Sequence, residues 1–434
     1  VSLDEVSKQL AGAKAKKKLH ALLCLHELGA KGGAASVSAV ISCLEDKNRH
    51  VRRRAIRTLV KVAEQGNDNK QAITALQAHV QDRDCSVQIV ALRALANLVD
   101  HGDQYTVSLA RSLLSHGNEC VRTAAVETLG QLAEEGDTTC FEDLFSGLYD
   151  TSDQVRCAAV AAIKSRGRKG DQQAVDAFTF CLQDTHGNVR EKAIRALAGL
   201  VERGHGSTIS AVRSCIDDVD DKVRLAALQA LVELTEKNDQ STISVVSARL
   251  EDSEPHVRQA AVEALERFDV KGDKRVIAVV SARLEDGDLN VRSAAKAALI
   301  TQLAEKGNQD AIREVTMRLK HWDDNVRLDT VKLLLQLTEK GNQLVINAME
   351  ACLHTWGDTV RWAAVEGLAH LAEEGDEHII TLLSSCFQDS DPIVRRRAVE
   401  ALGQLIAQGD KCAIAAVTAQ LSHREIHVRK AAAQ

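Results

Sequence analysis

Cysteine and histidine are the residues of this chain best suited to metal or thiol chemistry. The 434 residues include 11 cysteines and 15 histidines, and five cysteines each stand eight residues before a recurring valine: Cys43, Cys181, Cys215, Cys352 and Cys386. If stacked helices carry them, equivalent residues lie about 8–10 Å apart, whereas a Zn–S bond measures about 2.3 Å. We therefore expect these cysteines to be buried packing residues, and we predict no metal and no other cofactor.

The motifs of nucleophilic and nucleotide chemistry are also missing. The sequence has no Gly-x-Ser-x-Gly, no Gly-x-x-x-x-Gly-Lys-Ser/Thr and no Gly-x-Gly-x-x-Gly. The cysteines are odd in number and form no Cys-x-x-Cys pair, which favours free thiols in a reducing compartment. No run approaches the roughly 18 apolar residues of a membrane span. The sequence therefore predicts a soluble intracellular protein, in the cytoplasm, that is not an enzyme.

Basic side chains gather near the start of the chain, although the net charge is −6. Residues 1–61 carry 13 basic and 5 acidic side chains. The predicted binding cluster is Lys14, Lys16, Lys17, Lys18, Arg49, Arg53, Arg54 and Arg57. Cations this close repel one another, so they favour an anionic partner such as an acidic protein, RNA or lipid headgroups. An acidic protein is favoured over RNA, because no aromatic side chains are interleaved for base stacking.

Tryptophan occurs only three times, at Trp322, Trp356 and Trp362. Trp322 and Trp356 occupy the same position of neighbouring repeats, and Trp362 follows in the next helix. Two interpretations stay open. The rings form an exposed aromatic ridge that binds a partner, or they fill the space left where His321 and Thr355 replace the usual aspartate.

A repeat sets the positions of all these residues. Val-Arg occurs eleven times, from Val51-Arg52 to Val428-Arg429, and Val87-Gln88 is a twelfth copy. Nine of the eleven intervals between these valines are 34 residues; the first is 36, and the interval from Val291 to Val326 is 35. Alanine stands four residues after the valine in every copy except at Thr330, and Leu or Ile stands eight after it. Offsets of 0, 4 and 8 follow one face of a buried helix.

Glycine followed by Asp or Asn ends most copies about fifteen residues after the valine, as in Gly102-Asp103. Gly suits the left-handed residue after a helix, and Asp caps the next helix. Each repeat is thus predicted to be helix A, an acidic turn, helix B and a Gly corner. We predict an all-α, right-handed α-solenoid of about twelve stacked 34-residue hairpins. It is expected to be one continuous array over 1–434, with a partial unit at 1–34, regular units at 35–410 and a truncated unit at 411–434. One copy departs from this pattern, because Arg166 stands where a leucine is expected and two glycines follow it. This departure predicts a loosened segment at 164–171.

The pattern L-x-D-x-D-x-x-V-R-x-x-A-x-x-A-L, as in Leu284 to Leu299, resembles HEAT repeats. It is most similar to the short, proline-poor type also found in phycobilin-lyase-like proteins. The resemblance implies that an acidic residue in the A–B turn and the arginine opening helix B clip adjacent repeats together. The matching acidic positions are Asp46, Asp82, Asp150, Asp184, Asp218, Asp252, Asp286 and Asp389. His116, His321, Thr355 and His423 depart from it, as does Gln88 at the arginine position, so weaker joints are expected there.

These observations predict an interaction scaffold or adaptor within a larger assembly, with other proteins as partners and an acidic one at the basic N-terminal end. A nucleic-acid-binding solenoid that uses the same end is the alternative. A lyase-like enzyme is a weaker alternative, implied by the family resemblance only.

Overall fold

The computed structural model describes residue 10 and residues 14–28, 33–63, 69–134, 137–268, 270–355, 357–373, 375–407 and 411–433. Contacts divide the chain into two compact units, Val1–Leu234 and Thr235–Gln434. We call them the N-terminal unit and the C-terminal unit. The described residues form 25 α-helices, α2 to α26.

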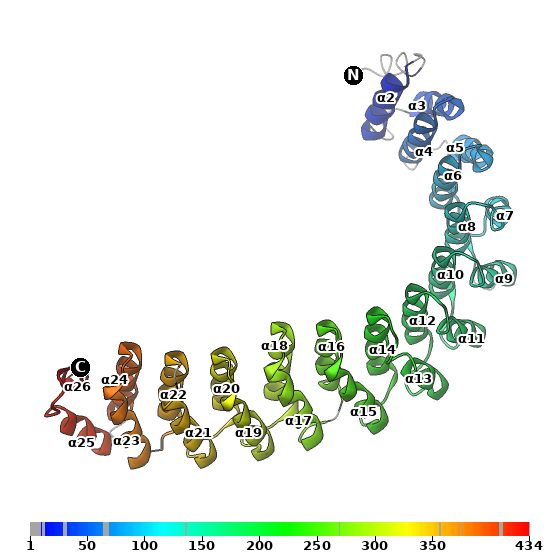
Figure 1. The fold of residues 1–434 in the computed structure, drawn as a ribbon. Helices are drawn as coiled ribbons and strands as arrows, with labels where there is room; N and C mark the ends of the chain where they lie inside the picture. The colour runs from blue at the N-terminus through cyan, green and yellow to red at the C-terminus, as the bar shows by residue number, and fades with distance from the viewer. Residues whose placement is uncertain are drawn as a thin grey trace. The chain divides into compact units, whose positions relative to one another are not determined.

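In the N-terminal unit, α2 is followed by six hairpins of one A helix and one B helix (Figure 1). The A helices are α3 (Gly33–Ser42), α5 (Asn69–Ala78), α7 (Gln104–Ser112), α9 (Thr138–Gly147), α11 (Gln172–Cys181) and α13 (Gly206–Arg213). The B helices are α2 (Ala15–Leu28), α4 (Arg49–Ala63), α6 (Cys85–Leu98), α8 (Glu119–Leu132), α10 (Asp153–Arg166), α12 (Gly187–Leu200) and α14 (Asp221–Leu234).

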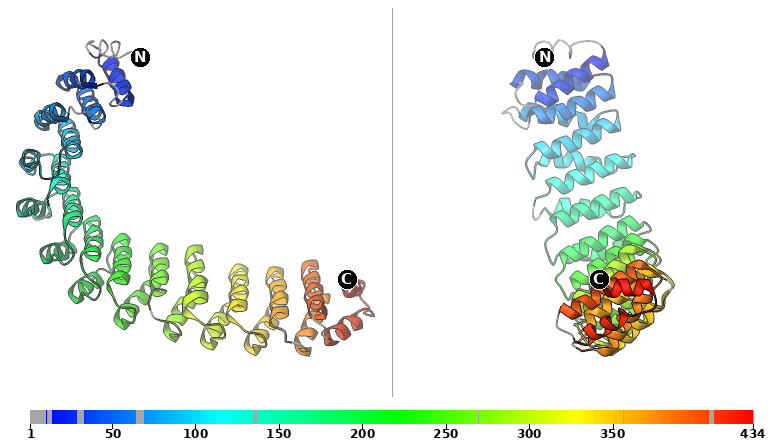
Figure 2. Two further views of the ribbon diagram at one scale, coloured as in Figure 1. Left: turned by 180° about the vertical axis from the view of Figure 1, so that it is seen from behind. Right: turned by 90° about the vertical axis from the view of Figure 1, so that its left-hand side faces the viewer.

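The C-terminal unit consists of six further hairpins. Its A helices are α15 (Gln240–Ala248), α17 (Lys274–Ala282), α19 (Gln309–Thr316), α21 (Gln343–Leu353), α23 (Glu377–Ser385) and α25 (Lys411–Gln420). Its B helices are α16 (Pro255–Leu265), α18 (Leu289–Ala298), α20 (Asp324–Leu337), α22 (Asp358–Leu371), α24 (Pro392–Ala407) and α26 (Ile426–Ala433). Within each unit the A helices and the B helices form two separate layers, which Figure 2 shows from behind.

The repeated apolar columns form the core between these layers. In α4, Val51, Ala55 and Leu59 are fully buried, as the offsets of 0, 4 and 8 predict. Each buried Val or Leu contributes about 1.5–3 kcal/mol relative to exposure. Small residues bring B helices close together, because a Cβ atom added to Gly130 of α8 would lie 2.4 Å from Cβ of Ala162 in α10. The expected all-α fold of about twelve stacked helical hairpins is confirmed.

The glycine corners connect each hairpin to the next one. Gly102 has φ of +80°, a conformation that a residue with a Cβ atom adopts only with strain. Its N–H donates to the carbonyl of Leu132, at the end of the B helix of the next hairpin, at 2.8 Å. Gly170, Gly204, Gly272, Gly307 and Gly341 make the same type of bond. The corner thus satisfies a helix-terminal carbonyl that has no partner within its own helix.

A π-helix, η6 (Leu299–Leu303), continues α18. It lies in the repeat whose valines are 35 residues apart, and the extra residue falls between Val291 and Gly307. The i→i+5 bonding of a π-turn accommodates one additional residue inside a helix, so the insertion leaves the flanking columns in register.

None of the described helices is both long enough and apolar enough to span a bilayer. The expectation of a single array across both units stays a prediction.

Candidate protein-binding surfaces

Arginines of the Val-Arg motif pair with the next repeat. Nε and Nη2 donate to the two carboxylate oxygens of one aspartate at 2.6–3.0 Å. The pairs are Arg52–Asp82, Arg122–Asp150, Arg156–Asp184, Arg190–Asp218, Arg258–Asp286 and Arg361–Asp389. Nη1 donates to the carbonyl six residues earlier, as from Arg156 to Asp150 at 2.8 Å. These six pairs form the predicted ladder between repeats.

The ladder changes the acidity of its members. Burial by itself would raise the pKa of Asp150, Asp184, Asp218 and Asp286, but the arginine and a backbone N–H bond to each carboxylate. The net effect lowers each pKa below its ordinary value. The aspartate in turn raises the pKa of its arginine. These guanidinium groups are occupied inside the fold, so the motif provides no array of phosphate-binding arginines.

Other joints lack the carboxylate. At His116, His321 and His423 the ring Nδ1 accepts the backbone N–H two residues later, a bond that aspartate makes elsewhere. Arg292 retains only its bonds to the carbonyls of Asp286 and Gly287. Gln88 occupies the arginine position whose partner position is His116. Its side-chain Nε2 donates to the Asp82 carbonyl at 2.8 Å. Histidine thus preserves the turn without the ion pair.

Two of the eight basic residues predicted to bind a partner are ion-paired inside the chain. Lys18 Nζ lies 2.8 Å from Asp46 Oδ2, and this hydrogen bond raises the pKa of Lys18. The pair has the 28-residue separation of Arg122 and Asp150, so Lys18 replaces the ladder arginine in the first repeat. Arg49 contacts Asp84 at 3.4 Å. Neither side chain is fully available to a ligand.

The other six form what we call the basic surface: Lys14, Lys16, Lys17, Arg53, Arg54 and Arg57. Within the part of the chain that the structure describes, none of them has an ion-pair partner. Lys14, Lys16, Lys17 and Arg57 are exposed, and Arg53 and Arg54 are half-buried. Arg93, one repeat further, pairs with Glu127 at 2.8 Å. Arg93, at the position that Arg57 has one repeat earlier, is therefore neutralised, whereas the six cations of the basic surface have no ion-pair partner among the described residues.

The basic surface lies at helix N-termini. Lys16 and Lys17 are in the first turn of α2, Arg53 and Arg54 begin the second turn of α4, and neither helix has an acidic residue in its first turn. A helix N-terminus carries about half a positive charge from its backbone dipoles, and anions bind there. Side chains and backbone together therefore produce a strongly positive region.

The tryptophans occupy different environments. Trp322 is 84% exposed, with the His321 ring 5.3 Å away, so its ring does not fill the space at position 321. Trp362 is half-buried on α22, where the Arg397 guanidinium of α24 lies 5.5 Å from the ring centroid. Trp356 lies outside the described residues. Partner binding by the three tryptophans stays a prediction.

The five cysteines in one column are buried, as the sequence predicts. Burial raises the pKa of Cys181, Cys352 and Cys386 to about 11, which makes them poor nucleophiles. In the residues that the structure describes, no three His, Cys, Asp or Glu side chains group together as metal ligands.

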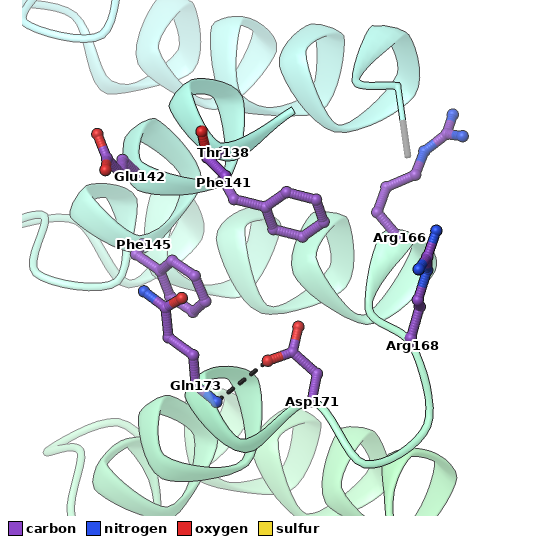
Figure 3. A pocket seen from close by; sticks show the side chains of 8 residues that line it. All are labelled: Thr138, Phe141, Glu142, Phe145, Arg166, Arg168, Asp171 and Gln173. Atoms are coloured by element: carbon purple, nitrogen blue, oxygen red, sulfur yellow. Dashed lines mark hydrogen bonds between the residues drawn. The ribbon is translucent and has the colours of Figure 1, made fainter. Parts of the chain in front are cut away.

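A cavity of about 320 Å³ between α9 and α11 has no counterpart among the sequence predictions (Figure 3). The rings of Phe141 and Phe145, 6.5 Å apart, form one wall, and the Asp171 carboxylate faces them. The Arg166 side chain lines it, and its Nε donates to the carbonyl of Gly130 at 2.8 Å. One signal was available in the sequence, since six of the eleven aromatics lie between residues 105 and 180.

The repeat geometry agrees with the comparisons to known proteins. A family model described as HEAT repeats matches residues 3–84, 73–146, 141–232, 209–300 and 370–434. The chain is similar to Kap121p in its structure with Ste12p, with a TM-score of 0.61 and 15% sequence identity. The match covers 96% of this chain and 50% of the Kap121p chain. Kap95p, in a structure with RanGDP, has a TM-score of 0.59 at 14% identity, over 100% of this chain and 66% of that one.

The chain thus spans about half the length of Kap121p. At 14–15% identity the likeness shows a shared fold. No curated protein matches the sequence significantly.

Proposed function

Because the chain belongs to the HEAT-repeat family, we propose that it is a scaffold for protein assembly, and that an acidic protein docks on the basic surface. A row of stacked hairpins presents a long surface with many exposed side chains. Among the similar structures, Kap121p is bound to Ste12p and Kap95p binds RanGDP. For this chain the basic surface is the specific feature that points to a type of partner.

One observation carries this proposal: six cations in the first three turns of α4 and at the start of α2 have no carboxylate partner among the described residues. One repeat further, Arg93 stands at the position of Arg57 and does pair with Glu127. Cations at a helix N-terminus oppose the backbone dipole and destabilise the fold. Carboxylates of a partner remove both repulsions, so binding gains free energy that the isolated chain lacks.

A protein fits this surface better than RNA. Single-stranded RNA is bound largely by stacking its bases on aromatic side chains, and no Phe, Trp or Tyr precedes Tyr105. The net charge of −6 also opposes general attraction to nucleic acid. We therefore assign the surface to acidic protein segments.

The remaining proposals concern the whole chain. We propose that both units form one continuous array, related to the short, proline-poor HEAT type. All eleven cysteines are free thiols, which fits a reducing intracellular compartment. Nothing specific to these residues supports a lyase or another enzyme activity, so the proposed role is binding.

The test is affinity capture followed by mass spectrometry, with a charge-reversal variant as comparison. The variant is Lys17→Glu, Arg53→Glu and Arg54→Glu. The matched control is Lys222→Glu, Lys332→Glu and Lys340→Glu, three exposed lysines elsewhere in the chain. We expect the basic-surface variant, but not the control, to lose acidic proteins from the captured set. Equal capture by both variants, or capture of RNA that nuclease removes together with the partners, would refute the proposal.

A further inference from the structure

Large apolar side chains are exposed at the starts of B helices in the C-terminal unit. Leu289 begins α18 and is 61% exposed, and Trp322 precedes α20 and is 84% exposed. Ile393 in the first turn of α24 is 46% exposed, and Ile426 at the start of α26 is 60% exposed. We call these four residues the turn-edge ridge, because the B-helix starts follow the A–B turns along one edge of the stack.

The repeat itself does not require this ridge. In the N-terminal unit the first residues of α4, α8, α10 and α14 are charged: Arg49, Glu119, Asp153 and Asp221. Among the described A–B turns there, Val219 is 94% exposed and Tyr149 is 69% exposed. Because the turn tolerates charge in one unit, the apolar residues at these four turns of the other are not needed for folding. Exposed apolar side chains that folding does not require are typical of an interaction site.

A cavity of about 620 Å³ opens along the same edge, between Trp322 and Ile393. It is lined by the turn before α22 and the turn before α24. Asp358 and Asp391 lie at its wall, and each accepts a backbone N–H through Oδ1 alone. Arg361 also lines the cavity, and Asp358 and Asp391 attract it electrostatically, but its two hydrogen bonds go to Asp389. Among the described residues, neither Asp358 nor Asp391 forms a direct ion pair, so three carboxylates share one guanidinium there. The cavity therefore favours a cation.

The spacing of the ridge indicates the shape of its ligand. Neighbouring B helices are about 8–10 Å apart, and seven residues of α-helix advance about 10.5 Å while returning to the same face. Four repeat steps separate Leu289 from Ile426, which is about 32–40 Å, or about 21–27 helical residues. A helix with one apolar residue per heptad thus places a side chain at each step.

We propose that the turn-edge ridge binds a basic amphipathic helix of a partner protein. Its apolar face packs on Leu289, Trp322, Ile393 and Ile426, and a Lys or Arg side chain enters the cavity between Asp358 and Asp391. Charge complementarity selects this ligand, because Asp288 and Asp323 also lie beside the ridge. The same carboxylates repel an anionic membrane surface, so the ligand is a protein segment and not a lipid layer.

A synthetic probe tests the proposal directly. The probe is a 25-residue peptide with Leu at heptad spacing, Lys on both flanks and a fluorescent label, titrated with the full chain by fluorescence anisotropy. The ridge variant is Leu289→Gln, Trp322→Gln and Ile393→Gln. The control variant is Val279→Gln and Leu344→Gln. These two apolar side chains lie on A helices and are 37% and 40% exposed, respectively. We expect at least a tenfold loss of affinity for the ridge variant and less than a twofold loss for the control.

Further variants and peptides test the charge and the helical shape of the proposed ligand separately. Asp358→Asn with Asp391→Asn retains the side-chain oxygens that accept the backbone N–H groups, and we expect several-fold weaker binding that depends less on salt. Peptides with Glu in place of Lys, or with a central proline, are expected to lose binding. The Trp emission of the full chain is expected to shift to the blue on binding, and Trp322→Phe removes that shift. Equal losses in the ridge and control variants, unchanged binding of the proline or Glu peptide, or binding of the chain to anionic vesicles would overturn the proposal.

Discussion

Replacing Arg190 by glutamine removes one step of the ion-pair ladder while leaving the turn in place. Arg190 makes two bonds to Asp218, at 2.6 and 2.7 Å, and one to the Asp184 carbonyl. Gln88 occupies the equivalent position naturally and retains the carbonyl bond, so Arg190→Gln isolates the contribution of the carboxylate pair. Arg292 has no carboxylate partner across its joint, and Arg292→Gln is therefore the matched control.

The size of the effect follows from burial. The side chains of Arg190 and Asp218 are 11% and 12% exposed. Removing one partner of such a pair costs about 3–5 kcal/mol, because it leaves a buried charge unpaired, and the retained carbonyl bond restores about 1 kcal/mol. We expect Arg190→Gln to lower the local opening free energy by about 2–4 kcal/mol, and Arg292→Gln by less than about 1 kcal/mol.

Hydrogen exchange measured by mass spectrometry is the suitable assay, since a repeat array opens locally and a single global unfolding energy is not defined. A loss of 2–4 kcal/mol corresponds to about 30- to 1000-fold lower amide protection, confined to α12 and α14. Equal loss of protection in the two variants would refute the assignment of the ladder as the clip between repeats.

The pH dependence has a definite sign. The pKa of Asp218 is lowered in the folded chain, so its stabilising contribution is present above its unfolded pKa of about 3.9 and disappears as the pH falls through the folded pKa. Protection of α12 and α14 should therefore fall below about pH 4 in the wild type. In Arg190→Gln the decline should be smaller, because the pair is already broken.

Three further predictions concern other parts of the chain. Gly170→Ala should destabilise the N-terminal unit by about 1–2 kcal/mol in thermal unfolding, because φ is +80° at this position although no atom obstructs an added Cβ. The control, Gly206→Ala, should be neutral or stabilising, because Gly206 also has open space but no positive φ. Cys181, whose pKa burial raises to about 11, should resist iodoacetamide at pH 8 while the exposed Cys120 reacts, as peptide mapping would show; equal labelling would contradict this. Amides of residues 164–171 should exchange faster than the matching segment 198–205, and uniform protection would contradict the effect expected from Arg166 and its glycines.

Local sequence signals predicted the repeat and most of its contacts. The 34-residue period placed Val51, Ala55 and Leu59 on one buried face, and the structure buries all three. Lys18 was predicted to bind a partner, but the structure pairs it with Asp46, 28 residues later, at a ladder position. Periodic positions are predictable since each repeat meets nearly the same neighbours, so one pattern describes every joint.

Only the tertiary structure decided which side chains remain without partners. Eight basic residues near the start look alike in the sequence, yet Lys18 and Arg49 contact aspartates while Arg57 does not. Apart from Trp322, the exposed row from Leu289 to Ile426 and the carboxylates beside it were not recognised from the sequence, because similar apolar residues are buried elsewhere in each repeat. The sequence by itself determined the helical hairpin and its stacking, since both depend on residues at fixed separations. The binding surfaces depend on contacts between different repeats, and these are set when the helices pack.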